Sequence, residues 1–112
     1  MAASDFFVEF DTLGREFRCK WSKDNGNASL KALDAVFSKH LPTLKAIEGV
    51  KSVKRVVCGE CQDFKIIVEI SAAGHDPWSK TSYSPETDIL SDFAAIEGAS
   101  GEETQTYTFM SF

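Results

Sequence analysis

The four-residue segment Ala46–Gly49 recurs letter for letter at Ala95–Gly98, and this repeat constrains the fold more than any other feature of the sequence. Each copy follows a run with helical spacing of apolar residues and precedes a run that is typical of a strand. A repeated supersecondary unit fixes an architecture more firmly than residue propensity does. We therefore expect two similar halves, each passing from a helix through a glycine into a strand.

Composition bounds the class of protein. The 112 residues are 43% hydrophobic, which predicts a single domain, residues 1–112, with one core. Nine Phe and two Trp can build that core without a metal or a disulfide. The net charge of −5 argues against a nucleic-acid partner. The start of the chain does not read as a secretory signal, and no apolar run approaches the length of a membrane span, so we expect a cytoplasmic protein.

The first half of the chain predicts two strands and a long helix. Alternation of apolar and polar residues indicates a strand at Phe6–Phe10, a turn at Asp11–Gly14, and a second strand at Phe17–Trp21. Apolar residues then recur every three or four positions over Leu30–Ile47, which predicts a helix. Pro42 lies inside this run, so we expect a kink or a break there.

The second half predicts a hairpin, a loop, a helix and a strand. Val50–Cys58 and Phe64–Ile70 are expected to pair as an antiparallel hairpin. Ala72–Tyr83 contains glycine, proline and small polar residues, and we interpret it as an irregular surface loop. Ser84, Pro85 and Glu86 form a typical helix start, which predicts a helix over Ser84–Gly98. The segment Thr104–Phe112 predicts the last strand.

The order strand, helix, strand, strand, helix, strand predicts an α+β fold of the ferredoxin-like, split βαβ kind. In this sandwich an antiparallel sheet carries two helices on one face, and the Phe6–Phe10 strand is expected as an extra N-terminal edge strand. The other face of the sheet must then meet water or a partner. Ile67 and several aromatic residues on that face favour coverage, and a homodimer is the commonest way to supply it.

The sequence also resembles the effector-binding domain of leucine-responsive regulators, and it is similar to the dimeric α/β barrel group and to ACT domains. The matching segments border the two glycines of the repeat and form the hairpin between them: Ile47–Val50, Val53, Val56, Gly59–Glu60, Asp63–Val68 and Ile96–Gly98. This resemblance implies a dimeric ferredoxin-like domain that binds a small molecule.

The spacing of Cys58 and Cys61 leaves three interpretations open. The pair can be an ordinary hairpin turn, a redox or regulatory thiol pair, or part of a metal site. Zinc needs four ligands, and Cys19 is expected in the core, so a zinc site would need these two cysteines from each of two chains.

The remaining candidates form a predicted ligand site near the hairpin and the following loop. Its residues are polar or aromatic and lie in those two segments: Gly59, Glu60, Asp63, His75, Trp78 and Tyr83. Trp78 and Tyr83 can also be anchors that hold the loop to the sheet. The lone His40 is expected to be solvent-facing or capping.

The main prediction is a noncatalytic small-molecule-binding or regulatory domain that acts as a homodimer without a cofactor. The first alternative is a small dimeric α/β barrel enzyme that acts on an apolar substrate between the sheet and the helices. The second alternative is a thiol redox or zinc site at Cys58 and Cys61.

Overall fold

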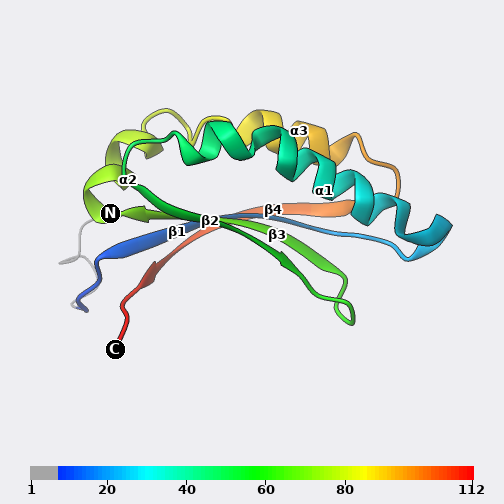
Figure 1. Ribbon diagram of the computed structural model, residues 1–112, viewed down its shortest axis with the longest axis horizontal. Helices are drawn as coiled ribbons and strands as arrows, with labels where there is room; N and C mark the ends of the chain where they lie inside the picture. The colour runs from blue at the N-terminus through cyan, green and yellow to red at the C-terminus, as the bar shows by residue number, and fades with distance from the viewer. Residues whose placement is uncertain (1–7) are drawn as a thin grey trace.

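The computed structural model describes residues 8–112, in which one antiparallel four-stranded sheet carries every helix on the same face (Figure 1). In chain order, the elements are β1 (Thr12–Lys20), α1 (Asp24–Lys45), β2 (Val50–Val57), β3 (Asp63–Ser71), α2 (Ala72–Ser79), α3 (Glu86–Ala94) and β4 (Ser100–Phe109). The strand order across the sheet is β2-β3-β1-β4. The predicted ferredoxin-like α+β fold is therefore confirmed. Within residues 8–112, no helix has both the length and the apolar character needed to cross a bilayer.

The repeated segment plays the same part in both halves. Ala46–Gly49 joins α1 to β2, and Ala95–Gly98 joins α3 to β4. The two glycines have φ angles of 90° and 91°, in the left-handed region that glycine adopts without a steric cost. The same hydrogen bond closes both links. Val50 N donates to the Ile47 carbonyl at 3.1 Å, and Ala99 N donates to the Ile96 carbonyl at 3.2 Å. The strands that follow are the two edges of the sheet, which confirms the prediction of matched halves.

The core lies between the sheet and the helices. Alternate residues of β1 and β3 face the helices, and the helices supply apolar residues opposite them. The largest fully buried side chains are Phe17, Phe64, Phe93, Leu13, Leu33, Leu44, Ile66, Ile70, Ile89, Val68 and Cys19. Removing this apolar surface from water is the main stabilising contribution to the fold.

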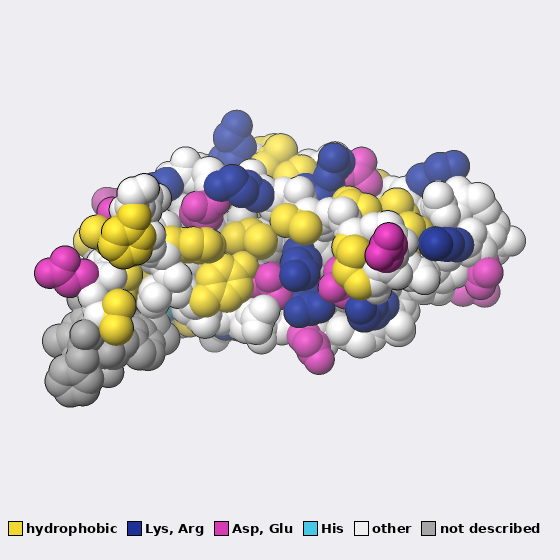
Figure 2. Space-filling model, turned by 90° about the horizontal axis from the view of Figure 1, so that it is seen from below, with side chains coloured by type: hydrophobic (Ala, Val, Ile, Leu, Met, Phe, Trp, Pro, Cys, Tyr) yellow, Lys and Arg dark blue, Asp and Glu magenta, His cyan; other side chains and the backbone are white. Residues whose placement is uncertain are grey.

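The opposite face of the sheet carries no helix, and apolar side chains gather on it beside lysine and arginine side chains (Figure 2). Glu16 lies on this face but is only 2% exposed. Its carboxylate accepts hydrogen bonds from Gln105 Nε2 at 2.7 Å and from Tyr107 Oη at 3.2 Å. Burial, and next the nearby Glu16 carboxylate, raise the pKa of Tyr107. The tyrosine therefore remains a neutral hydrogen-bond donor.

The N-terminal hairpin prediction is wrong where the structure can test it. Thr12 to Gly14 belong to β1 instead of forming a turn, and residues 8–11 form no strand. Phe6 and the rest of the predicted extra edge strand before Val8 lie outside the described residues. Gly14 has a packing role, because a Cβ there would lie 2.4 Å from Tyr107 Cε1 and 2.6 Å from Phe109 Cε2. It gives two aromatic rings room to lie across β1.

Two expectations about helices are also wrong. The predicted loop Ala72–Tyr83 begins with α2, whose first turn is capped by Ser71 Oγ accepting from Gly74 N at 3.1 Å. Small residues and Pro77 hide the helical pattern in the sequence. The chain does not break at Pro42, because α1 continues to Lys45. The non-helical backbone angles of α1 lie at residues 25–27 instead.

The first prediction tests the core with a matched pair of substitutions. Phe93 is fully buried and meets Phe64 edge to face at 6.2 Å between ring centroids. We expect Phe93→Ala to lower the free energy of unfolding by about 3–5 kcal/mol, because it removes buried surface and leaves a cavity. Phe112→Ala makes the same chemical change at a fully exposed position and should stay within about 0.5 kcal/mol of the wild type. Urea unfolding followed by circular dichroism measures both, and equal losses would contradict this core.

Candidate functional site

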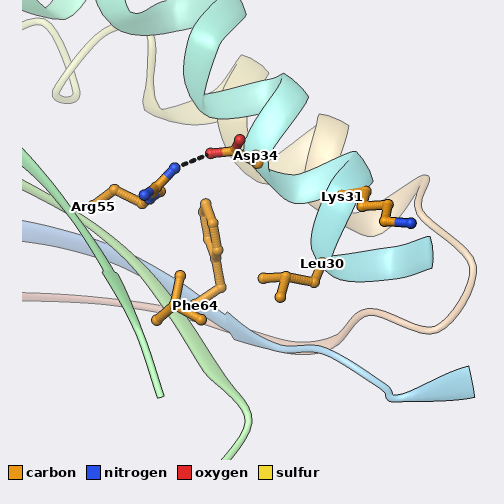
Figure 3. Close-up of a pocket in the computed structure, with 6 residues that line it drawn as sticks. Leu30, Lys31, Asp34, Arg55 and Phe64 are labelled. Carbon is orange, nitrogen blue, oxygen red and sulfur yellow. Dashed lines mark hydrogen bonds and ion pairs between the residues drawn. The ribbon is translucent and has the colours of Figure 1, made fainter. Parts of the chain in front are cut away.

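A pocket of about 280 Å³ opens between α1 and the β2 side of the sheet (Figure 3). Its lining comes from one helix and two neighbouring strands: Leu30, Lys31, Asp34, Arg55, Val57 and Phe64. The volume lies just below the range of about 300–1,000 Å³ that is usual for small-molecule sites. Figure 3 shows the Phe64 ring pointing from the sheet toward α1, with Leu30 beside it.

The local sequence explains why these side chains converge. Leu30 and Asp34 are four residues apart on α1, so they lie on the same side of the helix. Arg55 and Val57 are two residues apart on β2, so they share one face of the strand. Phe64 pairs with Val57 across the β2–β3 ladder and is on the same face. The pocket therefore has an apolar wall on the sheet and a charged rim on its outer side.

The rim holds an exposed ion pair. Arg55 Nη1 donates to Asp34 Oδ1 at 2.6 Å, and both side chains are 47% exposed. Water screens such a pair, so it can open to admit a ligand at little cost. Lys31 adds a second positive charge to the lining. Two cations and one carboxylate leave the rim with a net positive charge, which favours a ligand with an anionic group.

The structure separates the predicted ligand residues into two groups. Gly59 and Glu60 lie in the exposed turn between β2 and β3, and Asp63 begins β3. His75 and Trp78 lie in α2, beyond the other end of that nine-residue strand. The strand spans about 27 Å at 3.4 Å per residue. The six residues therefore do not line one common site.

Asp63 is an anchor between β1 and the hairpin. Its carboxylate lies 2.7 Å from Lys20 Nζ and accepts a hydrogen bond from Arg18 Nη2 at 3.0 Å. Its own carbonyl accepts from Trp21 Nε1 at 3.3 Å. The hydrogen bond from Lys20, together with the charge and hydrogen bond of Arg18, holds the pKa of Asp63 below its ordinary value.

The side chains of His75, Trp78 and Tyr83 lie close together and pack against one another. Tyr83 Oη and His75 Nε2 are 3.3 Å apart, and the Trp78 and Tyr83 rings meet edge to face at 5.1 Å. The guanidinium of Arg15 lies 3.9 Å from the centroid of the Tyr83 ring and forms an ion pair with Glu86 at 2.6 Å. His75 is 3% exposed. This geometry fits the interpretation in which the aromatic residues anchor the segment after β3 to the sheet.

The two hairpin cysteines are joined. Cys58 and Cys61 form a disulfide with their Cα atoms 5.6 Å apart. Cys19 is free and buried, as predicted, and burial, with the Glu102 and Asp63 charges, raises the pKa of its thiol to about 12. Within residues 8–112, no group of three or more potential metal ligands lies together. A disulfide also lacks the thiolates that a zinc site needs.

The prediction that His40 faces solvent is wrong, because it forms a buried polar pair with a distant residue. His40 on α1 is buried, and its Nε2 lies 2.7 Å from Asp92 Oδ2 on α3. Hydrogen bonds from His40 and from Lys39 hold the pKa of Asp92 below its ordinary value. The partners are 52 positions apart, and no local pattern connects them. The pair joins α1 to α3 on the helix-covered face of the sheet.

No protein-family model matches the chain, and no curated protein does. Solved structures do match. SnoaB, a cofactor-independent oxygenase from Streptomyces nogalater, is 14% identical over 91% of this chain and 96% of its own, with a TM-score of 0.60. A Bordetella bronchiseptica protein assigned as an antibiotic biosynthesis monooxygenase is 10% identical over 89% of this chain and 98% of its own, with a TM-score of 0.60. A dimeric Bacteroides fragilis protein of unknown function and ferredoxin-like fold is 13% identical over 90% of this chain and all of its own, with a TM-score of 0.59.

These similarities show that the chain has a ferredoxin-like fold. The resemblance to leucine-responsive regulators and ACT domains is not confirmed. The main functional prediction, a noncatalytic binding or regulatory domain, is contradicted. Those similar structures whose activity is stated are oxygenases, which favours the enzyme alternative.

The second prediction compares two arginine–carboxylate pairs of equal length. Arg15 and Glu86 are 13% and 15% exposed, whereas Arg55 and Asp34 are each 47% exposed. We expect Arg15→Gln to lower the free energy of unfolding by about 1–3 kcal/mol or more, because Glu86 loses its partner away from water. Arg55→Gln should cost less than about 1 kcal/mol, since water replaces the lost contact. Urea titration measures both variants, and a larger loss for Arg55→Gln would contradict the assignment of Arg55 to an open rim.

Proposed function

We propose that this chain is a small enzyme of the dimeric α/β barrel group, an oxygenase that acts on an apolar, ionisable substrate held between α1 and the sheet. The observation that carries the proposal is the pocket itself. An apolar wall of Leu30, Val57 and Phe64 stands opposite a rim of positive net charge. Such a site suits an aromatic substrate that loses a proton and becomes an anion. The stated oxygenase activity of two proteins with this fold supports the same class of reaction.

Each part of the pocket has a role in the proposed chemistry. The apolar wall holds the substrate rings by burying their surface, and the exposed ion pair at the rim can open to admit them. Asp34 is the carboxylate of the lining and accepts the substrate proton. Arg55 stabilises the resulting anion. The electron-rich anion then passes electrons to O₂.

The overall reaction balances without a cofactor when the substrate carries an acidic CH₂ group. Conversion of CH₂ to C=O releases four electrons, which reduce O₂ so that one oxygen atom enters the product and the other leaves as water. Substrate and O₂ thus supply every atom and electron. The description of SnoaB as cofactor-independent agrees with this requirement.

The proposed assembly is a homodimer that buries the helix-free face of the sheet. One row of residues across that face runs from Lys54 through Ile67 and Glu16 to Gln105. Apolar groups on either side of this row include Val56 and Phe109, both 37% exposed, and Tyr107. A second copy of the same face supplies matching apolar surface. The dimeric state of the Bacteroides fragilis protein supports this arrangement.

The third prediction tests the assembly. Ile67 is half-buried near the middle of the open face, so Ile67→Glu should place an unpaired charge in the proposed interface and shift the protein to monomer. Thr43→Glu adds the same charge on the exposed side of α1 and should remain a dimer. Light scattering at micromolar concentration distinguishes the two states. A wild type that is strictly monomeric would contradict the proposed dimer.

The fourth prediction tests the pocket. Anthrone, a tricyclic compound with an acidic CH₂ group, is a suitable substrate, and an oxygen electrode records O₂ uptake. Val57→Trp should lower kcat/KM about tenfold or more, because the indole fills the pocket from a side chain that is 43% exposed. Thr43→Trp introduces the same ring at an exposed position of α1 and should leave kcat/KM unchanged.

Two outcomes of this experiment would count against the proposal. If neither anthrone nor related phenols and quinols give enzyme-dependent O₂ uptake, the chain is not the oxygenase proposed. If uptake occurs but Val57→Trp and Thr43→Trp behave alike, the reaction takes place elsewhere on the molecule.

A further inference from the structure

The turn that joins β2 to β3 carries a disulfide directly beside two pocket residues. Cys58 follows Val57 in the chain, and Cys61 precedes Phe64 by three positions. Cys61 is exposed and Cys58 is half-buried. The disulfide therefore lies where a soluble thiol can reach it, on the same hairpin that supplies the sheet side of the pocket.

Contacts other than the disulfide hold the end of this hairpin to β1. Trp21 N donates to the Gln62 carbonyl at 3.0 Å, and Gln62 Nε2 donates to the Trp21 carbonyl at 2.7 Å. Lys20 Nζ donates to the Cys61 carbonyl at 2.8 Å. These contacts do not need the sulfur–sulfur bond. Opening the disulfide should therefore change the turn and leave the sheet paired.

The surroundings of the two sulfur atoms favour thiol–disulfide exchange. Cys61 N donates a hydrogen bond to Cys58 Sγ at 3.1 Å, which stabilises negative charge on that sulfur. An external thiolate can thus attack the exposed Cys61 Sγ and displace Cys58 as a stabilised thiolate.

We propose that Cys58 and Cys61 form a reversible dithiol/disulfide site whose redox state sets the affinity of the neighbouring pocket for its ligand. In the reduction, a first external thiolate forms a mixed disulfide with Cys61 and releases the Cys58 thiolate. A second external thiolate attacks the external sulfur of the mixed disulfide, which releases Cys61 and forms the external disulfide. Two electrons pass to the protein, and the cysteines take up two protons. The regulatory part of this proposal rests on the proposed function of the pocket.

The path of the chain explains how a change in the turn affects the pocket. Gln62 has a φ angle of 56°, a left-handed conformation that is uncommon for a residue with a side chain. The disulfide closes the segment that leads into this residue, and Phe64 follows two positions later. Reduction removes that constraint, so the turn and the exposed Val57 side chain beside it gain freedom to move at the pocket wall, while Phe64 stays buried in the paired sheet. A change in the wall alters the fit of an apolar ligand.

The fifth prediction begins with the chemistry of the cysteines. The folded protein is incubated in glutathione buffers of increasing reducing strength, alkylated with iodoacetamide, and analysed by mass spectrometry. Cys58 and Cys61 should become alkylated together and recover the disulfide on reoxidation. Cys19 serves as an internal control that should stay unmodified, because the residue is 1% exposed and burial raises the pKa of its thiol to about 12. If Cys58 and Cys61 are modified only when Cys19 is also modified, the site opens by unfolding and the proposal is overturned.

The second arm of the experiment measures the pocket with 1-anilinonaphthalene-8-sulfonate, an apolar anion that fluoresces when bound. Dye bound in the pocket is identified as the part of the binding that is lost in Val57→Trp. The Kd of this binding should differ about fivefold or more between oxidised and reduced protein, which is the low end of the usual coupling between two sites. The double variant Cys58→Ser with Cys61→Ser should give one Kd whatever the redox buffer. Circular dichroism in both buffers checks that the fold is intact.

The outcomes separate this inference from the proposed function. Equal Kd values in the two redox states, or no component removed by Val57→Trp, would overturn the redox control of the pocket. A redox-dependent Kd in a protein that shows no O₂ uptake would support the redox site while contradicting the oxygenase. Neither arm relies on enzyme turnover.

Discussion

The antiparallel pairing of β1 with β3 is the constraint on which the rest of the structure depends. The register runs without interruption from Thr12 opposite Ser71 to Lys20 opposite Asp63. Because side chains alternate along a strand, this register places the buried apolar residues of both central strands on the helix face. A slip of one position would turn them all to the other face. The same alternation sends Arg15 to the aromatic cluster under the helices and Glu16 to the open face.

The length of β3 divides the polar chemistry of the molecule between two ends. At one end, the disulfide hairpin, Asp63 and the pocket lie close together on β2, β3 and α1. Beyond the other end, His75 and Tyr83 form a closed cluster that fastens α2 and the following segment to the sheet. The first end has exposed charges beside the pocket, whereas the side chains of the aromatic cluster at the second end contact one another. This difference is why the proposed chemistry belongs to the pocket, and the aromatic cluster fits a structural role.

Strong local patterns were sufficient to predict most of the architecture. The repeated Ala-Ile-Glu-Gly segment located both helix-to-strand links, because glycine alone takes a φ near 90° at no steric cost. The clean alternation over Phe64–Ile70 located a central strand. The failures occurred where local signals were weak or had two explanations. Gly14 suggested a turn, but it lies in β1 and leaves room for the Tyr107 and Phe109 rings of β4. Pro77 suggested a loop, but it lies inside α2.

By itself, the sequence determined the order of the four strands, α1 and α3, the faces of the central strands and the presence of cysteines in a tight hairpin. These depend on the spacing of residues along the chain, which a pattern of apolar and polar positions records directly. Only the tertiary structure decided that Arg55 on β2 meets Asp34 on α1, that His40 meets Asp92, and that the six predicted ligand residues separate into two groups. Contacts of this kind join positions far apart in the chain, and packing of whole elements sets their distances, so no short stretch of sequence contains them.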